Sequence, residues 1–217
     1  MSIKLAVFDC DGTLSDGQAA VCIAMESAFA AHDLPCPSRN SVRRIVGLSL
    51  PQAIRALAPE ANDGTLRDLV ESYKQAFRTA RENGSLQEPL YDGIADLLAR
   101  LDAKGWVLGV ATGKSDRGLK STLAVHGLSG LFGPLHTADR HPSKPHPSML
   151  EAAMQDVFAA PENTVMIGDT VYDMQMARAA RTRAIGVDWG YHEAGELLEA
   201  GAQGVARTMV ELEEMIG

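Results

Sequence analysis

Five runs of mostly apolar residues, each of strand length, recur along the chain without the polar alternation of a half-exposed strand. They cover residues 3–8, 106–112, 134–138, 164–169 and 183–188. Short continuous runs of this kind are typical of strands that are covered on both faces. The pattern therefore predicts a parallel sheet.

Segments with helical periodicity lie between the later runs. In residues 92–105, leucine and isoleucine recur at helical spacing, and Gly105 predicts the end of the helix. Further helices are predicted over residues 115–127, 146–158 and 171–180. Because strands and helices alternate, we predict an α/β fold with a doubly wound, Rossmann-like parallel sheet.

The segment after the first strand breaks this alternation. Residues 17–87 contain four helix-like stretches and no strand-like run. We therefore expect residues 1–16 and 88–217 to form the α/β core. Residues 17–87 are expected to form a helical cap inserted after the first strand.

Composition narrows the class of protein. The chain of 217 residues has 28 acidic and 20 basic side chains, a net charge of −8, and only 5% aromatic residues. This balance disfavours binding to nucleic acid. The three cysteines form no CxxC pair, a pattern typical of proteins whose thiols stay reduced. No apolar run is long enough to span a bilayer. We expect a cytoplasmic monomer or homodimer that binds neither nucleic acid nor membrane.

Polar residues follow the predicted strands, at the edge where parallel strands end. Asp9 and Asp11 follow the first run, and Asp169 and Asp173 follow the fourth. Residues two apart in an extended segment point the same way, so Asp9 and Asp11 are expected to face one volume. Carboxylates gathered there would repel one another unless a cation lies between them, and oxygen ligands suit Mg²⁺.

Three further residues at this edge suit a phosphate group. The Thr112 hydroxyl and the Gly113 amide can donate hydrogen bonds to it, and Lys144 can neutralise its charge. Gly12 would let the backbone approach closely. Each signal also has an ordinary structural explanation: a helix cap at Asp169-Thr170, a turn at Asp11-Gly12, or a solvated surface lysine at Lys144.

Four motifs in chain order resemble those of the haloacid dehalogenase-like hydrolases. They are "DCDGT" at residues 9–13, "ATGKS" at 111–115, "SKPHP" at 143–147 and "GDTVYD" at 168–173. The helical insert is similar to the cap of the branch that contains phosphoglycolate phosphatases and β-phosphoglucomutases. The resemblance covers nearly the whole chain.

This resemblance implies a role for each motif residue. Asp9 would be the nucleophile that forms an aspartyl-phosphate, and Asp11 the general acid and base. Thr112 and Lys144 would hold the phosphate in the catalytic site. Mg²⁺ would be held by Asp9, the backbone carbonyl of Asp11, Asp169 and, directly or through water, Asp173. The expected substrate-binding residues are Gly12, Thr13, Thr112, Gly113 and Lys144.

The insert bears on the choice of substrate. Its segment "VGLSLPQAI" (residues 46–54) resembles the specificity segment of phosphoglycolate phosphatases, and Val46 stands where β-phosphoglucomutases usually place an arginine. Gly17 also departs from the serine or threonine frequent in the family. We expect a phosphatase acting on a small, phosphoglycolate-like metabolite. The alternatives are a phosphosugar mutase, a pyrophosphatase, or a binding protein that has lost catalysis.

Overall fold

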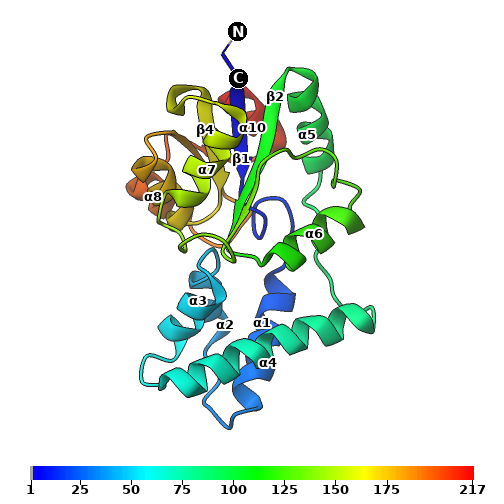
Figure 1. Cartoon of the computed structure of the whole chain (residues 1–217), viewed down its shortest axis with the longest axis vertical. Coiled ribbons are helices and arrows are strands. Elements are labelled where there is room, and N and C mark those ends of the chain that lie inside the picture. Colours follow the sequence, from blue (N-terminus) through cyan, green and yellow to red (C-terminus); the bar gives the residue numbers. More distant parts are fainter. Residues whose placement is uncertain (1) are drawn as a thin grey trace.

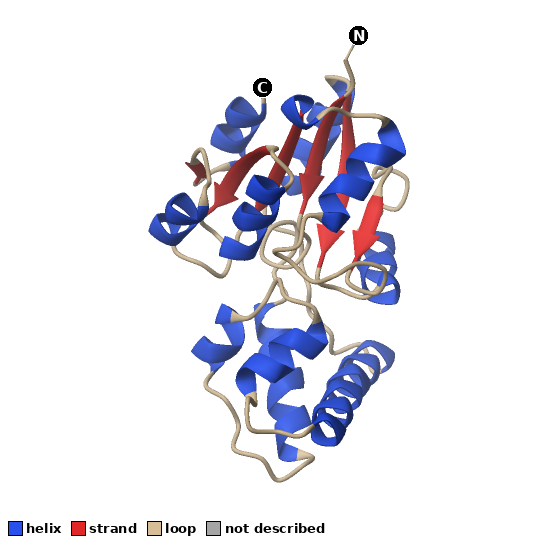
Figure 2. Cartoon of the chain, turned by 60° about the vertical axis from the view of Figure 1, so that its left-hand side comes forward, coloured by secondary structure: helices blue, strands red, loops and turns tan. Residues whose placement is uncertain are grey.

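A computed structural model describes residues 2–217 and contains a six-stranded parallel sheet (Figure 2). Its order is β3-β2-β1-β4-β5-β6. The strands are β1 (Lys4–Phe8), β2 (Trp106–Thr112), β3 (Leu135–Thr137), β4 (Thr164–Gly168), β5 (Arg183–Val187) and β6 (Val205–Ala206). The predicted doubly wound α/β fold is confirmed. Strand β6 has only two residues and was not predicted.

Helices cover both faces of the sheet. Helices α5 (Ile94–Ala103), α6 (Asp116–Val125) and α10 (Met209–Ile216) pack on one face, and α7 (Ser148–Val157), α8 (Val171–Ala179) and α9 (Ala194–Ala200) pack on the other. In β1, Phe8 belongs to the first layer and Val7 to the second, and neither is exposed. Burial on both faces explains why the strand runs lack polar alternation.

The strand order reverses beside β1. The chain passes from β1 to β2 and β3 on one side, then crosses to β4 on the other side of β1. The Asp9 amide donates a hydrogen bond to the Ile167 carbonyl at 2.9 Å, so the ends of β1 and β4 stay paired. Ligands of such sheets bind at this reversal, outside the carboxyl ends of the strands.

The helical insert lies beyond those strand ends (Figure 1). It consists of α1 (Gln18–Ala30), α2 (Arg39–Arg44), α3 (Leu50–Leu57) and α4 (Asp63–Glu82), which pack around a core of their own. The two connections to the sheet domain run side by side, since the Asp16 amide donates to the Pro89 carbonyl at 2.8 Å. The borders at residues 17 and 87 stay a prediction. No helix within residues 2–217 is both long and apolar enough to cross a membrane.

Candidate active site

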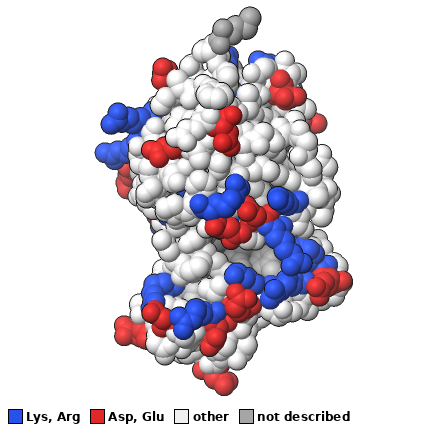
Figure 3. Space-filling model, viewed as in Figure 1, with Lys and Arg blue, Asp and Glu red and all other residues white. Residues whose placement is uncertain are grey.

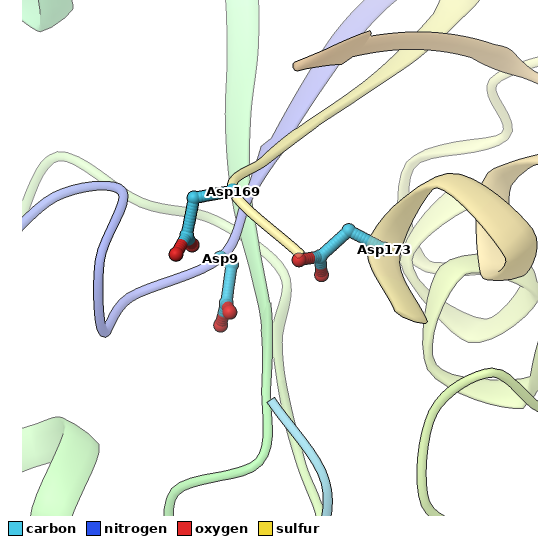
Figure 4. A group of neighbouring side chains, drawn as sticks. All are labelled: Asp9, Asp169 and Asp173. Carbon is cyan, nitrogen blue, oxygen red and sulfur yellow. The ribbon is translucent and has the colours of Figure 1, made fainter. Parts of the chain in front are cut away.

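Three carboxylates meet where the strand order reverses. Asp9 follows β1, Asp169 follows β4, and Asp173 lies in the first turn of α8. One carboxylate oxygen from each lies within 4.8 Å of the others, and all three side chains are buried (Figure 4). The structure thus brings together residues that are 164 positions apart, between Asp9 and Asp173.

Asp169 is fixed from two sides. Its Oδ1 accepts a hydrogen bond from the Thr13 hydroxyl, and its Oδ2 accepts one from the Tyr191 amide, both at 2.9 Å. Gly12 has φ +84°, and a Cβ there would lie 2.2 Å from Asp169 Oδ2. Glycine is therefore required at this position by the approach of Asp169. Contact of Gly12 and Thr13 with substrate stays a prediction.

Lys144 is completely buried rather than a solvated surface lysine. Its Nζ lies 2.6 Å from Asp173 Oδ1 and 3.0 Å from Asp9 Oδ1. Burial alone would lower the pKa of Lys144, but the two carboxylates outweigh it and raise that pKa. The ammonium group therefore stays charged between them.

Asp173 also contributes to the start of α8. The Thr170 amide and hydroxyl both donate to Asp173 Oδ2, at 3.1 Å and 2.7 Å. Thr170 is the N-cap residue of that helix. The helix-cap explanation thus applies to Thr170, and the same local structure aims Asp173 at Asp9.

The Asp11 side chain lies apart from the three clustered carboxylates. Its Oδ1 accepts a hydrogen bond from Lys114 Nζ at 2.7 Å, and the same ammonium group donates to Glu88 at 2.7 Å. The extended geometry ends at Asp9 because the next residues turn, with the Leu14 amide bonded to the Cys10 carbonyl. Asp9 and Asp11 nevertheless line one cleft, as the sequence predicted.

Burial raises the pKa of Asp9 to about 7; Lys144 opposes this shift and Asp173 adds to it. Burial, Asp9 and Asp173 likewise raise the pKa of Asp169 well above its usual range. Within residues 2–217, Asp9 Oδ2 is buried and has no hydrogen-bond partner. A free buried carboxylate oxygen beside two further carboxylates fits a hard divalent cation, whose charge would reverse these shifts.

The cleft above these residues has a volume of about 360 Å³, a size suited to a small ligand. Thr112 and Gly113 line its core side, and Val46 and Leu48 of the insert line the opposite side. A Cβ on Gly113 would lie 2.6 Å from the Leu48 carbonyl oxygen. Glycine at this position therefore lets the insert approach the end of β2.

Comparison with known proteins gives the family. The model of the haloacid dehalogenase-like hydrolases matches residues 6–187. The chain belongs to this family. Phosphatases of the family generally use a metal ion, and the structure contains an acidic cluster of Asp9, Asp169 and Asp173.

Relatives match along nearly the whole chain. The probable phosphatase IndB of Dickeya dadantii is 35% identical over 213 residues, covering 96% of this chain and 91% of its own. A phosphoglycolate phosphatase of Nitrosococcus oceani is 27% identical, with coverages of 98% and 96%. The crystal structure of a predicted phosphatase from Clostridium acetobutylicum, 26% identical, matches with a TM-score of 0.88 over 100% and 99% of the two chains. The predicted membership in this hydrolase family is confirmed.

Sequence reasoning missed several neighbours of the family motifs. Lys114 lies within the motif at residues 111–115 but has no predicted role, and Glu88 and His192 have no predicted part in the site. His192 is buried, and its Nδ1 accepts a hydrogen bond from the Val171 amide at 3.2 Å. The position of Lys114 inside a motif was an available signal. No local pattern marks Glu88 as its partner.

Proposed function

We propose that this hydrolase is a Mg²⁺-dependent phosphatase that cleaves a small phosphorylated metabolite through an aspartyl-phosphate at Asp9. The observation that carries the proposal is the unpartnered, buried Asp9 Oδ2 beside Lys144 and two further carboxylates. A carboxylate that keeps one oxygen free of hydrogen bonds can contact a cation through one oxygen and phosphorus through the other. The phosphatases among its relatives support the same reaction class, a phosphoric monoester hydrolase.

The reaction has two displacements. A carboxylate oxygen of Asp9 forms a bond to phosphorus while the bond to the ester oxygen breaks, and protonated Asp11 donates its proton to the leaving alkoxide. Asp11 then accepts a proton from a water molecule that attacks the aspartyl-phosphate, releasing phosphate and free Asp9. Burial raises the pKa of Asp11, with Lys114 opposing it, which suits a group that must hold a proton in the first step.

Binding of the phosphate falls to residues around Asp9. Lys144 is held 3.0 Å from Asp9 Oδ1 and would neutralise charge on the phosphoryl oxygens. Thr112 ends β2 at the cleft, and its hydroxyl and the Gly113 amide would donate hydrogen bonds to those oxygens. Gly12 and Thr13 complete the proposed loop around the phosphate.

The carboxylates of Asp9 and Asp169 and the backbone carbonyl of Asp11 would hold Mg²⁺, with Asp173 assisting directly or through water. When bound, the ion neutralises phosphate charge and that of the carboxylates. Asp173 already accepts hydrogen bonds from Lys144 and Thr170, which supports an indirect part for it.

The insert, residues 17–87, would serve as a cap that encloses the substrate over the core formed by residues 1–16 and 88–217. The cleft volume and the phosphoglycolate phosphatase among the relatives support a small, phosphoglycolate-like substrate. We also propose that the protein is a cytoplasmic monomer or homodimer that binds neither nucleic acid nor membrane. Pyrophosphatases are also among the relatives, so inorganic pyrophosphate is the second candidate substrate.

Release of inorganic phosphate from a panel of phosphorylated metabolites and pyrophosphate tests the proposal. We expect release from a small monoester that needs Mg²⁺ and stops with a chelator. Isomerisation of a phosphosugar without phosphate release would instead indicate the mutase. No turnover of any ester with Mg²⁺ present would contradict the phosphatase.

A further inference from the structure

One wall of the cleft carries positive charge despite the acidic composition of the chain. Lys74, Arg78 and Arg81 line the cleft from α4, at intervals of four and three residues, so they share one face of that helix. Arg117 of α6 lines the cleft from the core. Figure 3 shows Lys and Arg side chains gathered around the hollow between the sheet domain and the insert.

Three of these cations have no acidic partner among the residues that the structure describes. Lys74 is paired with Glu71 at 2.9 Å. Of the other insert arginines, Arg39, Arg44 and Arg55 are paired, whereas Arg43 and Arg67 have no ion pair within residues 2–217. Within residues 2–217, no carboxylate lies within 4.0 Å of the guanidinium groups of Arg78, Arg81 or Arg117.

Arg78 stands out further. Its Nε is buried and has no hydrogen-bond partner among the described residues. A buried polar atom without a partner is costly, and a charged one more so. A half-buried arginine of the cleft wall therefore has a donor that no described protein group satisfies.

Local helix electrostatics do not account for this arrangement. A cation in the last turn of α4 is favourable, which explains Arg81 alone. Arg117 lies in the first turn of α6, where the helix dipole disfavours positive charge. Arg78 and Arg81, three residues apart on α4, also repel each other. Helix electrostatics therefore disfavour Arg117 at its position and disfavour the close spacing of Arg78 and Arg81.

We propose that Arg78, Arg81 and Arg117 form a subsite for a second anionic group of the substrate, remote from the phosphate that reacts at Asp9. The guanidinium fork matches both carboxylate and phosphate oxygens, and either group would satisfy Arg78 Nε. Because two arginines belong to the insert and one to the core, the bound anion would also link the two parts over the ester. The inference rests on the proposed phosphatase activity, and it names the residues that would select the substrate.

Matched pairs of esters test the subsite. We would compare kcat/KM for carboxyalkyl phosphates of increasing length with alkyl phosphates of equal length, and for alkane bisphosphates as a third arm. The wild-type protein should prefer the esters with a second anion, and the favoured arm identifies carboxylate or phosphate. In Arg78→Gln and Arg117→Gln this preference should fall by about tenfold or more, the scale of a lost charged hydrogen bond.

Arg67→Gln is the matched control, because Arg67 lies on α4, is exposed and does not line the cleft. Its selectivity should equal that of the wild type, and circular dichroism melts verify that all variants fold. Equal kcat/KM for anionic and neutral esters, or an unchanged preference in folded Arg78→Gln, would overturn the subsite.

A binding measurement separates failure of the subsite from failure of the phosphatase. Calorimetry would compare a carboxyalkyl phosphonate with the alkyl phosphonate of equal length, neither of which can be hydrolysed. Weaker binding of the carboxylated ligand to Arg78→Gln supports the subsite even without turnover, and equal binding contradicts it. Absence of turnover on every ester contradicts only the proposed reaction.

Discussion

The two walls of the cleft differ in whether their charged side chains have partners within the protein. On the core wall, Lys144 lies between Asp9 and Asp173, and Asp169 accepts hydrogen bonds from two sides. On the insert wall, Arg78 keeps a buried nitrogen that has no partner in the described part of the chain. The core thus holds its reacting groups in place before substrate binds. The insert leaves positive charges that are free to pair with an anionic group of the substrate.

The difference has an energetic basis. Removing one member of a buried ion pair strands the other, which costs about 3–5 kcal/mol. Exposed pairs such as Lys74 and Glu71 contribute about 0–1 kcal/mol. Core-wall substitutions that leave a buried charge without a partner should therefore damage both folding and chemistry, whereas substitutions in the insert wall should alter substrate selection with little loss of stability.

The largest expected effect comes from Asp9→Asn. The amide is nearly isosteric but cannot attack phosphorus, so kcat should fall by about a thousandfold or more. The thermal midpoint should change little, because the side chain keeps its size and Lys144 keeps its ion pair with Asp173. Stopped assays of phosphate release and a calorimetric melt measure both. Substantial activity in the purified variant would contradict a nucleophilic Asp9.

Lys144→Met should cost the most stability. It leaves Asp9 and Asp173 buried without their cation, and we expect the free energy of unfolding to drop by about 3–5 kcal/mol. The control Lys74→Met, at an exposed ion pair, should cost less than about 1 kcal/mol. Urea titrations of both variants provide the comparison. Equal losses would contradict the contrast between the walls.

Asp169→Ala should weaken Mg²⁺ binding. Half-maximal activity should then require at least about tenfold more Mg²⁺, and raising the concentration should recover part of the rate. Titration of activity with Mg²⁺ provides the test. An unchanged Mg²⁺ dependence would limit Asp169 to shaping the turn before α8.

The smallest effect is expected at an ion pair between the insert and the core that does not line the cleft. Arg44 of the insert pairs with Glu196 of the core at 2.5 Å, and its hydrogen bond holds the pKa of Glu196 down at about 2. A lowered pKa stabilises the fold above the ordinary value of about 4.5, and this contribution fades as pH falls toward 2. Both side chains are over a third exposed, so Glu196→Gln should cost under about 1 kcal/mol near pH 7. The gap between the melting curves of variant and wild type should narrow with acid; a gap constant with pH would rule out the ion pair.

The core could be predicted from sequence because its signals are local. The runs that form β1, β2 and β4 are continuous and apolar, and the polar residues after them meet wherever parallel strands end. Strand β6 was not predicted, because two residues are too few to show a periodic pattern. Helices α9 and α10 were not predicted either, and no motif lies next to them in the sequence.

Contacts between distant segments could not be predicted. Lys114 joins Asp11 to Glu88, two core residues that lie far from each other in the sequence. The Leu48 carbonyl approaches Gly113 because the insert folds back onto the core. Gly12 was expected to admit phosphate, yet a Cβ at this position would collide with an Asp169 oxygen, a constraint from 157 residues away. Burial of Lys144 likewise follows from the sheet topology and not from its own motif.

The most direct test of the account is to trap the aspartyl-phosphate. A single turnover of a radiolabelled phosphate ester with Mg²⁺ would be quenched in acid within milliseconds, and the protein digested for mass spectrometry. We predict a hydroxylamine-sensitive phosphoryl group on Asp9, which accumulates in Asp11→Asn and is absent from Asp9→Asn. Turnover with no label on the protein, or with the label on another residue, would contradict the mechanism.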